Sequence, residues 1–87
     1  MLKISHAESP QGAVTLTLAG RLVGPWVGEL RRVCEPLLAG RRAMALDLAE
    51  VSFLDAEGVA TLHAYLARGV TLQNCSPFVD QQIRTSN

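Results

Sequence analysis

Residues 44–62 read MALDLAEVSFLDAEGVATL, and this stretch decides the fold. Its first five residues carry an apolar side chain at every second position and a single charge at Asp47. A run this short and nearly all apolar is typical of a strand buried in a sheet. Residues 51–54, which are apolar except for Ser52, then predict a loop, and the chain enters the segment Asp55-Ala56-Glu57-Gly58. The stretch therefore predicts a strand, a loop and the beginning of a helix.

Asp55 stands where this helix is expected to begin. Its carboxylate can accept hydrogen bonds from the free amides of the following residues, as an N-cap does. Glu57 adds a negative charge in the first turn, where the helix dipole favours it. We therefore predict a helix over residues 56–68 and a helix-ending turn at Gly69. Three apolar residues form its expected inward stripe: Val59, Leu62 and Leu66.

The segment before residue 44 shows first the strand period and then the helix period. Residues 2–8 and 13–19 alternate apolar and polar side chains around a turn that contains Pro10 and Gly12, which predicts an antiparallel hairpin. From Pro25 the apolar period lengthens to about 3.6 residues, as expected of an amphipathic helix with proline in its first turn. We expect Gly40 to close that helix.

The segment after Gly69 predicts a short strand over residues 70–73 and a last helix. Ser76 is expected to cap that helix, and Val79 and Ile83 are expected to point inward. The whole order is β-β-α-β-α-β-α. Strand–helix–strand connections favour parallel pairing, so we predict an α/β fold with a mixed sheet and helices on one main face. Residues 1–87 are expected to form a single domain.

The layout of these elements resembles the STAS family, the domain shared by sulfate transporters and anti-sigma-factor antagonists. The family signature is a strand ending in Asp-Leu, an apolar loop, and Asp-Ser/Thr-x-Gly at the start of the second helix. Here it reads Asp47-Leu48, residues 51–54 and residues 55–58. Residues 14–22 resemble the second strand of the family, and residues 69–77 resemble its fourth strand and following turn.

The resemblance implies a non-catalytic protein-interaction module that regulates transcription in bacteria. Its partner would be an anti-sigma factor or another kinase-like regulatory protein, which in the family phosphorylates a Ser or Thr directly after the Asp. The expected positions are Ala56 and Glu57, and neither has a hydroxyl group. Glu57 supplies one permanent negative charge, which could act as a phosphomimic or simply favour the helix start. The residues implied to bind the partner are Phe53, Leu54, Asp55, Ala56, Glu57, Thr61 and Tyr65 or His63.

The resemblance leaves three further possibilities open. The first is an accessory STAS subunit that docks on a component of a phospholipid-trafficking or other ABC transporter. The second is a domain that binds a nucleotide, a lipid or another small ligand. The third concerns assembly: the last helix is short, and if the sheet edge or the groove beside Val79 and Ile83 is left open, a second copy could cover it in a homodimer.

Composition excludes several other classes of function. Eight basic and eight acidic residues cancel, so no net field attracts nucleic acid. No apolar run approaches the roughly 20 residues that span a bilayer, so we expect a cytoplasmic protein without direct membrane insertion. Cys34 and Cys75 are expected to be free buried or half-buried thiols, and no metal or cofactor motif is present. Ser52, Asp55 and His63 could suggest a catalytic triad, but His63 lies too far along the helix to meet Asp55.

Overall fold

The computed structural model describes residues 2–85. Three helices and four strands alternate in the predicted β-β-α-β-α-β-α order, which confirms the α/β fold. Their bounds are β1 (Leu2–Glu8), β2 (Val14–Leu22), α1 (Pro25–Ala39), β3 (Met44–Leu54), α2 (Ala56–Ala67), β4 (Thr71–Gln73) and α3 (Pro77–Thr85). The four strands form one sheet in the order β1-β2-β3-β4. β1 is antiparallel to β2, and the other two pairings are parallel, so the sheet is mixed as predicted.

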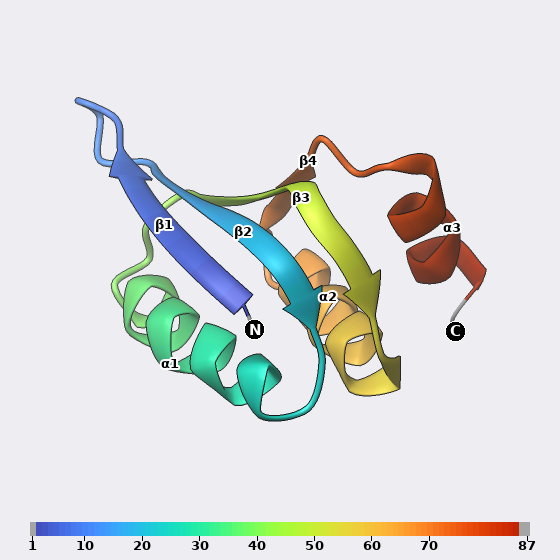
Figure 1. The fold of residues 1–87 in the computed structure, drawn as a ribbon. Helices are drawn as coiled ribbons and strands as arrows, with labels where there is room; N and C mark the ends of the chain where they lie inside the picture. Colours follow the sequence, from blue (N-terminus) through green and yellow to red (C-terminus); the bar gives the residue numbers. More distant parts are fainter. Residues whose placement is uncertain (1, 86–87) are drawn as a thin grey trace.

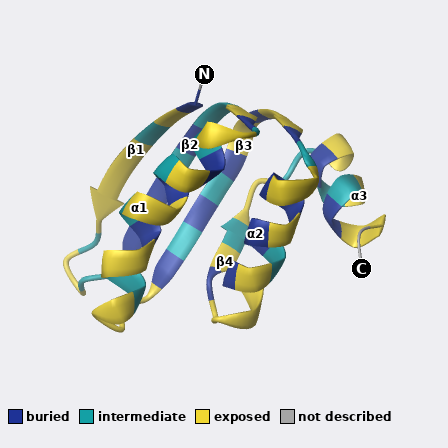
Figure 2. Ribbon diagram, turned by 90° about the horizontal axis from the view of Figure 1, so that it is seen from below, coloured by how far each residue is buried: buried dark blue, intermediate teal, exposed yellow. Residues whose placement is uncertain are grey.

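Both α1 and α2 lie on one face of the sheet (Figure 1). Seen from that side, the buried residues of the two helices and of the strands meet between the layers, where the core lies (Figure 2). The opposite sheet face carries small and polar side chains, such as Thr15, Thr17 and Ala45, which are only half-buried. A bilayer-spanning helix needs about 20 apolar residues, and none of the helices within residues 2–85 combines sufficient length and apolarity.

Strand β3 is longer than predicted, because residues 51–54 continue the strand instead of forming a loop. Thr17 lies opposite Asp47, but Ala19 lies opposite Glu50, so β3 holds one extra residue at this point. A second register shift follows between Gly20 and Arg21. Such bulges change the face on which the following side chains lie. They keep three residues buried at a spacing of three: Leu48, Val51 and Leu54.

Helix α3 covers the part of the β3 edge that β4 leaves open. β4 pairs only with residues 45–47, and α3 lies beside the remaining length of β3 (Figure 1). The side-chain amide of Gln82 donates a hydrogen bond to the backbone oxygen of Leu54 at 3.0 Å. An unpaired strand edge is a template for pairing with another chain, so α3 protects this edge.

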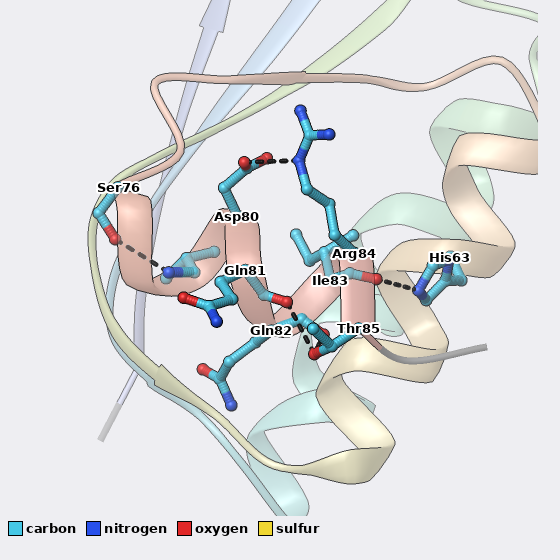
Figure 3. Close-up of polar contacts among 9 residues, drawn as sticks. His63, Ser76, Asp80, Gln81, Gln82, Ile83, Arg84 and Thr85 are labelled. Carbon is cyan, nitrogen blue, oxygen red and sulfur yellow. Dashed lines mark hydrogen bonds and ion pairs between the residues drawn. The ribbon is translucent and has the colours of Figure 1, made fainter.

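The inward residues of α3 are those predicted. Val79 and Ile83 are 0% and 7% exposed, and the Ser76 hydroxyl accepts a hydrogen bond from the Val79 amide at 3.2 Å (Figure 3). The cap at Ser76 is thus confirmed. The groove beside Val79 and Ile83 is not open, because α3 packs both side chains against the rest of the fold.

The two longer helices end differently from one another. Gly69 follows α2 with φ 90°, and the Val70 amide donates to the Tyr65 oxygen at 3.0 Å, so the predicted glycine turn is confirmed. After α1, Gly40 keeps an ordinary φ of −78°, and the left-handed residue is Arg41, with φ 58°. The chain therefore reverses one residue later than the sequence predicted.

Candidate functional site

Asp55 joins β3 to α2 as the predicted N-cap. Its backbone is extended, with φ −89° and ψ 180°. One carboxylate oxygen accepts a hydrogen bond from the Gly58 amide at 2.7 Å. Glu57 lies in the first turn, as predicted. These contacts fix the direction in which α2 leaves the sheet.

The second carboxylate oxygen of Asp55 binds the loop between β2 and α1. It accepts a hydrogen bond from the Gly24 amide at 2.8 Å, and the Asp55 amide donates to the Leu22 oxygen at 3.3 Å. The hydrogen bond from the Gly24 amide, followed by that from the Gly58 amide, holds the pKa of this carboxyl below its usual value, because both bonds stabilise its ionised form. Asp55 therefore ties the starts of α1 and α2 together.

Gly58 allows the close approach on which this junction depends. A Cβ atom at this position would lie 2.5 Å from the Leu22 backbone oxygen and 3.3 Å from a carboxylate oxygen of Asp55. No side chain fits at that distance, because a backbone oxygen cannot move aside as the end of a flexible side chain can. The glycine of the Asp-x-x-Gly segment is thus required by packing between α2 and β2.

Two of the residues predicted to bind a partner lie fully on the surface at the helix start. Ala56 and Glu57 are exposed, Asp55 is half-buried, and Phe53 is 37% exposed. Leu54 is 1% exposed, so its prediction as a surface residue is wrong. The bulges in β3 direct its side chain into the core. The accessible part of the predicted surface is therefore narrow.

Thr61 and Tyr65 were also predicted on the outward face of α2, and both predictions are wrong. They are 3% and 2% exposed, because α1 covers this side of α2. The Thr61 hydroxyl accepts a hydrogen bond from Arg31 at 3.0 Å, and the Tyr65 hydroxyl donates to Glu35 at 3.2 Å. Leu66, predicted to point inward, is 42% exposed instead.

The Glu35 carboxylate is the centre of this contact between α1 and α2. Arg68 donates to its two oxygens at 3.1 and 2.8 Å, and this guanidinium is the main cause that lowers the pKa of Glu35. Burial raises the pKa of the neighbouring Tyr65 and of the Cys34 thiol, the latter to about 12. The cluster holds α1 and α2 together, with Tyr65 and Cys34 buried and with Glu35 and Arg68 exposed at the surface.

His63 was the alternative to Tyr65 in the predicted surface, and it faces α3. Its Nε2 atom lies 2.8 Å from the Ile83 oxygen (Figure 3). The Ser52 hydroxyl donates to the Gly20 oxygen at 3.2 Å. Ser52, Asp55 and His63 thus bind three separate groups and do not converge. Within residues 2–85, no three His, Cys, Asp or Glu side chains lie close enough to hold a metal ion.

Sequence reasoning did not find an aromatic contact beside the helix start. Phe78, in the first turn of α3, is 53% exposed and stacks on Phe53, with ring centroids 6.5 Å apart and an angle of 28° between the rings. The Arg21 guanidinium lies 5.6 Å from the Phe53 centroid. These three residues form what we call the aromatic patch. The pairing depends on how α3 packs against β3, and no local sequence signal encodes that packing.

Several solved structures have a similar fold, including the following three. The anti-sigma factor antagonist SpoIIAA in its unphosphorylated form has a TM-score of 0.74 and 18% identity, over 94% of this chain and 82% of that one. An uncharacterized DUF3478-family protein from Shewanella loihica, with a SpoIIAA-like fold, has a TM-score of 0.62 and 18% identity, over 99% of this chain and 76% of that one. An anti-sigma-factor antagonist STAS domain from Rhodobacter sphaeroides has a TM-score of 0.56 and 14% identity, over 85% of this chain and 87% of that one.

Sequence comparison adds a match to one protein family, whereas no curated protein matches the chain. The family is described as "Mlab, STAS domain", and its model matches residues 5–87. This match covers the sheet from β1 onward and the Asp55–Gly58 junction. The chain therefore belongs to the STAS domain family, in the group described as "Mlab, STAS domain".

Proposed function

We propose that this chain is a non-catalytic protein-interaction module that presents the start of α2 to a partner protein, as an anti-sigma-factor antagonist does. The observation that carries the proposal is the Asp55 junction. Its carboxylate is bound to the Gly24 amide of the β2–α1 loop and to the Gly58 amide in the first turn of α2, and the next two side chains, Ala56 and Glu57, are exposed. A surface that is already ordered loses little conformational entropy when it binds.

The proposed module lacks the phosphorylation switch found elsewhere in the family. Ala56 and Glu57 have no hydroxyl group to accept phosphate. Of the nearest hydroxyls, Thr61 is buried and Ser52 donates to a backbone oxygen. Glu57 carries one constant charge where phosphorylation would add about 1.5 to 2. We propose that partner binding is therefore not controlled at this site by a kinase.

The missing switch can be tested by restoring it. Ala56→Ser places a hydroxyl directly after Asp55, and serine is tolerated at helix starts. Incubation with ATP and a cognate or related anti-sigma kinase should leave the parent chain unmodified and add one phosphate to the Ala56→Ser variant, as measured by intact-mass spectrometry. Stoichiometric phosphorylation of the parent chain would show that another residue serves as the switch.

The binding surface is tested by a pair of matched substitutions. Ala56→Arg adds a long charged side chain at the proposed surface, and Ala39→Arg adds the same side chain at the exposed far end of α1. We expect the first variant to lose the proteins that the parent captures from native lysate, and the second to retain them. Equal capture by both variants, with unchanged melting curves, would contradict the proposed surface.

A second candidate function is an accessory subunit of a phospholipid-trafficking or other ABC transporter. The lack of an acceptor hydroxyl at Ala56 and Glu57 favours it, since a permanent subunit needs no release by phosphorylation. Both candidates place the chain in the cytoplasm. Identification of the captured protein separates them, because the first requires a kinase-like regulator and the second requires a transport component.

A homodimer stays a prediction, and the groove beside Val79 and Ile83 gives no support for it. Val79 and Ile83 are buried within the fold, so a dimer would have to use another surface. Sedimentation equilibrium at micromolar concentration decides the question. A single species of 9.4 kDa that is unchanged on tenfold concentration would rule the dimer out.

A further inference from the structure

The aromatic patch lies on the sheet face opposite α1 and α2, next to the start of α3. Arg21 and Phe53 are register partners near the ends of β2 and β3. Phe78 reaches the same place from α3 and stacks on Phe53. The two rings remain 37% and 53% exposed. Exposed apolar residues scattered singly are ordinary, whereas a contiguous group indicates an interaction site.

Arg21 gives the patch an unneutralised positive charge. Its guanidinium lies over the Phe53 ring at 5.6 Å from the centroid, which is a favourable cation–π geometry. Within residues 2–85, no carboxylate forms an ion pair with Arg21. Four other arginines each have an acidic partner: Arg32, Arg42, Arg68 and Arg84. The edge of the Arg21 guanidinium therefore remains available to bind a carboxylate.

A hollow of about 310 Å³ opens beside Phe78 on α3. Its other lining residues are Gln81, Gln82 and Thr85. Figure 3 shows the side chains of the two glutamines on the side of α3 away from His63. The hollow thus adds amide and hydroxyl groups to one side of the ring. A large apolar centre with a polar rim is the usual composition of an energetically important contact.

We propose that the aromatic patch is a docking surface for a segment of the partner protein that carries a large apolar side chain next to an acidic one. The apolar side chain packs on Phe53 and Phe78, and the carboxylate binds Arg21. The proposal rests on the proposed function, because it assumes an interaction module. It extends that surface from Ala56 and Glu57 across Phe53, two residues before Asp55, to α3.

A second copy of this chain is a poorer occupant of the patch. A symmetric dimer centred there would bring Arg21 of one copy toward Arg21 of the other, because both copies use the same surface. Like charges at such a contact oppose binding. Two half-exposed rings also supply far less than the roughly 800 Å² per partner of a standard stable interface. Charge complementarity therefore favours an acidic segment of a different protein.

Selection from a phage-displayed library of random 12-residue peptides tests this proposal with the intact chain as bait. We expect the selected peptides to contain Asp or Glu next to Phe, Trp, Leu or Ile. Their dissociation constants should rise at least tenfold for Phe78→Ala and for Arg21→Glu. Two matched controls should leave binding unchanged: Leu66→Ala removes another exposed apolar side chain, and Arg41→Glu reverses another exposed charge.

The outcomes separate this inference from the proposed function. Selected peptides that bind Phe78→Ala and Arg21→Glu as tightly as the parent, or that lack acidic residues, would overturn the inference, as would a selection without specific binders. Binding of the peptides to a dimer alone, shown by sedimentation, would also overturn it in favour of a second copy. Loss of the natural partner by Ala56→Arg but not by Phe78→Ala would refute this inference and leave the proposed function intact.

Discussion

Asp55 connects two segments that are distant in the sequence, because one of its carboxylate oxygens binds an amide of the β2–α1 loop and the other binds an amide in the first turn of α2. Asp55→Ala removes both hydrogen bonds, to Gly24 and to Gly58. Loss of an N-cap costs about 0.5–2 kcal/mol of stability, and the second bond places the expected loss in the upper part of that range. Urea unfolding measures it. A free energy of unfolding equal to that of the parent would show that Asp55 does not cap α2.

The same carboxylate makes the junction sensitive to acid. Because the pKa of Asp55 is lowered in the fold, its stabilising effect is present above the pKa of an unfolded aspartate, about 3.9, and is lost as the pH falls through the lower pKa of the folded state. Asp55→Asn should therefore lose less stability than the parent as the pH falls below about 4. Parallel acid-unfolding curves for the two proteins would contradict this expectation.

Gly58 and Gly28 offer a matched pair of glycines within helices. A Cβ atom at Gly58 would lie 2.5 Å from the Leu22 backbone oxygen, whereas one at Gly28 meets nothing within 4 Å. Gly58→Ala should destabilise the fold by about 1–3 kcal/mol through overpacking. Gly28→Ala should stabilise it by about 0.5–1 kcal/mol through helix propensity. Thermal unfolding of both variants checks the two signs, and equal shifts would contradict the close approach.

At the scale of single residues, the features that could be predicted depend only on residues adjacent in the sequence. The cap at Asp55 and the charge at Glu57 followed from the spacing of adjacent residues. The bond from Asp55 to Gly24 spans 31 residues, and it depends on how β2 and β3 are paired. No pattern within a short window encodes such a contact.

At the scale of elements, the structure differs from the prediction in which residues of α2 pack against α1. Thr61 and Tyr65 are buried there because Arg31 and Glu35 bind their hydroxyl groups. A polar residue in a helical pattern predicts a surface position, whereas the polar atom of each of these residues has a partner on α1. The inward stripe of α2 therefore includes positions that hydrophobicity alone cannot identify, and Leu66 lies outside it.

Tyr65 provides the test of this helix packing. Tyr65→Phe keeps the buried ring and removes only the hydroxyl, so it should leave partner capture unchanged and lower the melting temperature slightly. Tyr65→Ala removes the ring and should cost about 3–5 kcal/mol. Weaker partner capture by Tyr65→Phe, with an unchanged melting curve, would restore Tyr65 to the binding surface.

At the scale of the whole molecule, the reactivity of the two free thiols shows how well the core excludes solvent. Cys34 is 0% exposed, and burial raises its pKa to about 12. Cys75 is half-buried, and burial raises its pKa as well. The thiolate is the reactive form, so iodoacetamide at pH 8 should modify Cys75 first and Cys34 only after unfolding in guanidinium. Peptide mass spectrometry distinguishes the two, and equal rates in the native protein would contradict the packing of α1.

The order of elements and the mixed sheet were predictable because strand and helix periods are visible in the sequence. The bulges in β3 were not, since Val51 and Leu54 also suit an apolar loop. The aromatic patch was not predictable either, because Phe53 and Phe78 meet only after α3 has packed beside β3. Sequence thus described the elements well and the surfaces between them poorly.

The position of α3 along the open edge of β3 has a consequence for synthesis on the ribosome. β3 ends at Leu54, and α3 ends only at Thr85, so β3 leaves the ribosome before the helix that shields it. At usual elongation rates of about 5–20 residues per second, the delay is on the order of seconds. During that time the unpaired amides and oxygens of β3 are open to strands of other nascent chains. Crowded polysomes should therefore be the place where this small domain is most prone to aggregate, and where chaperones help it most.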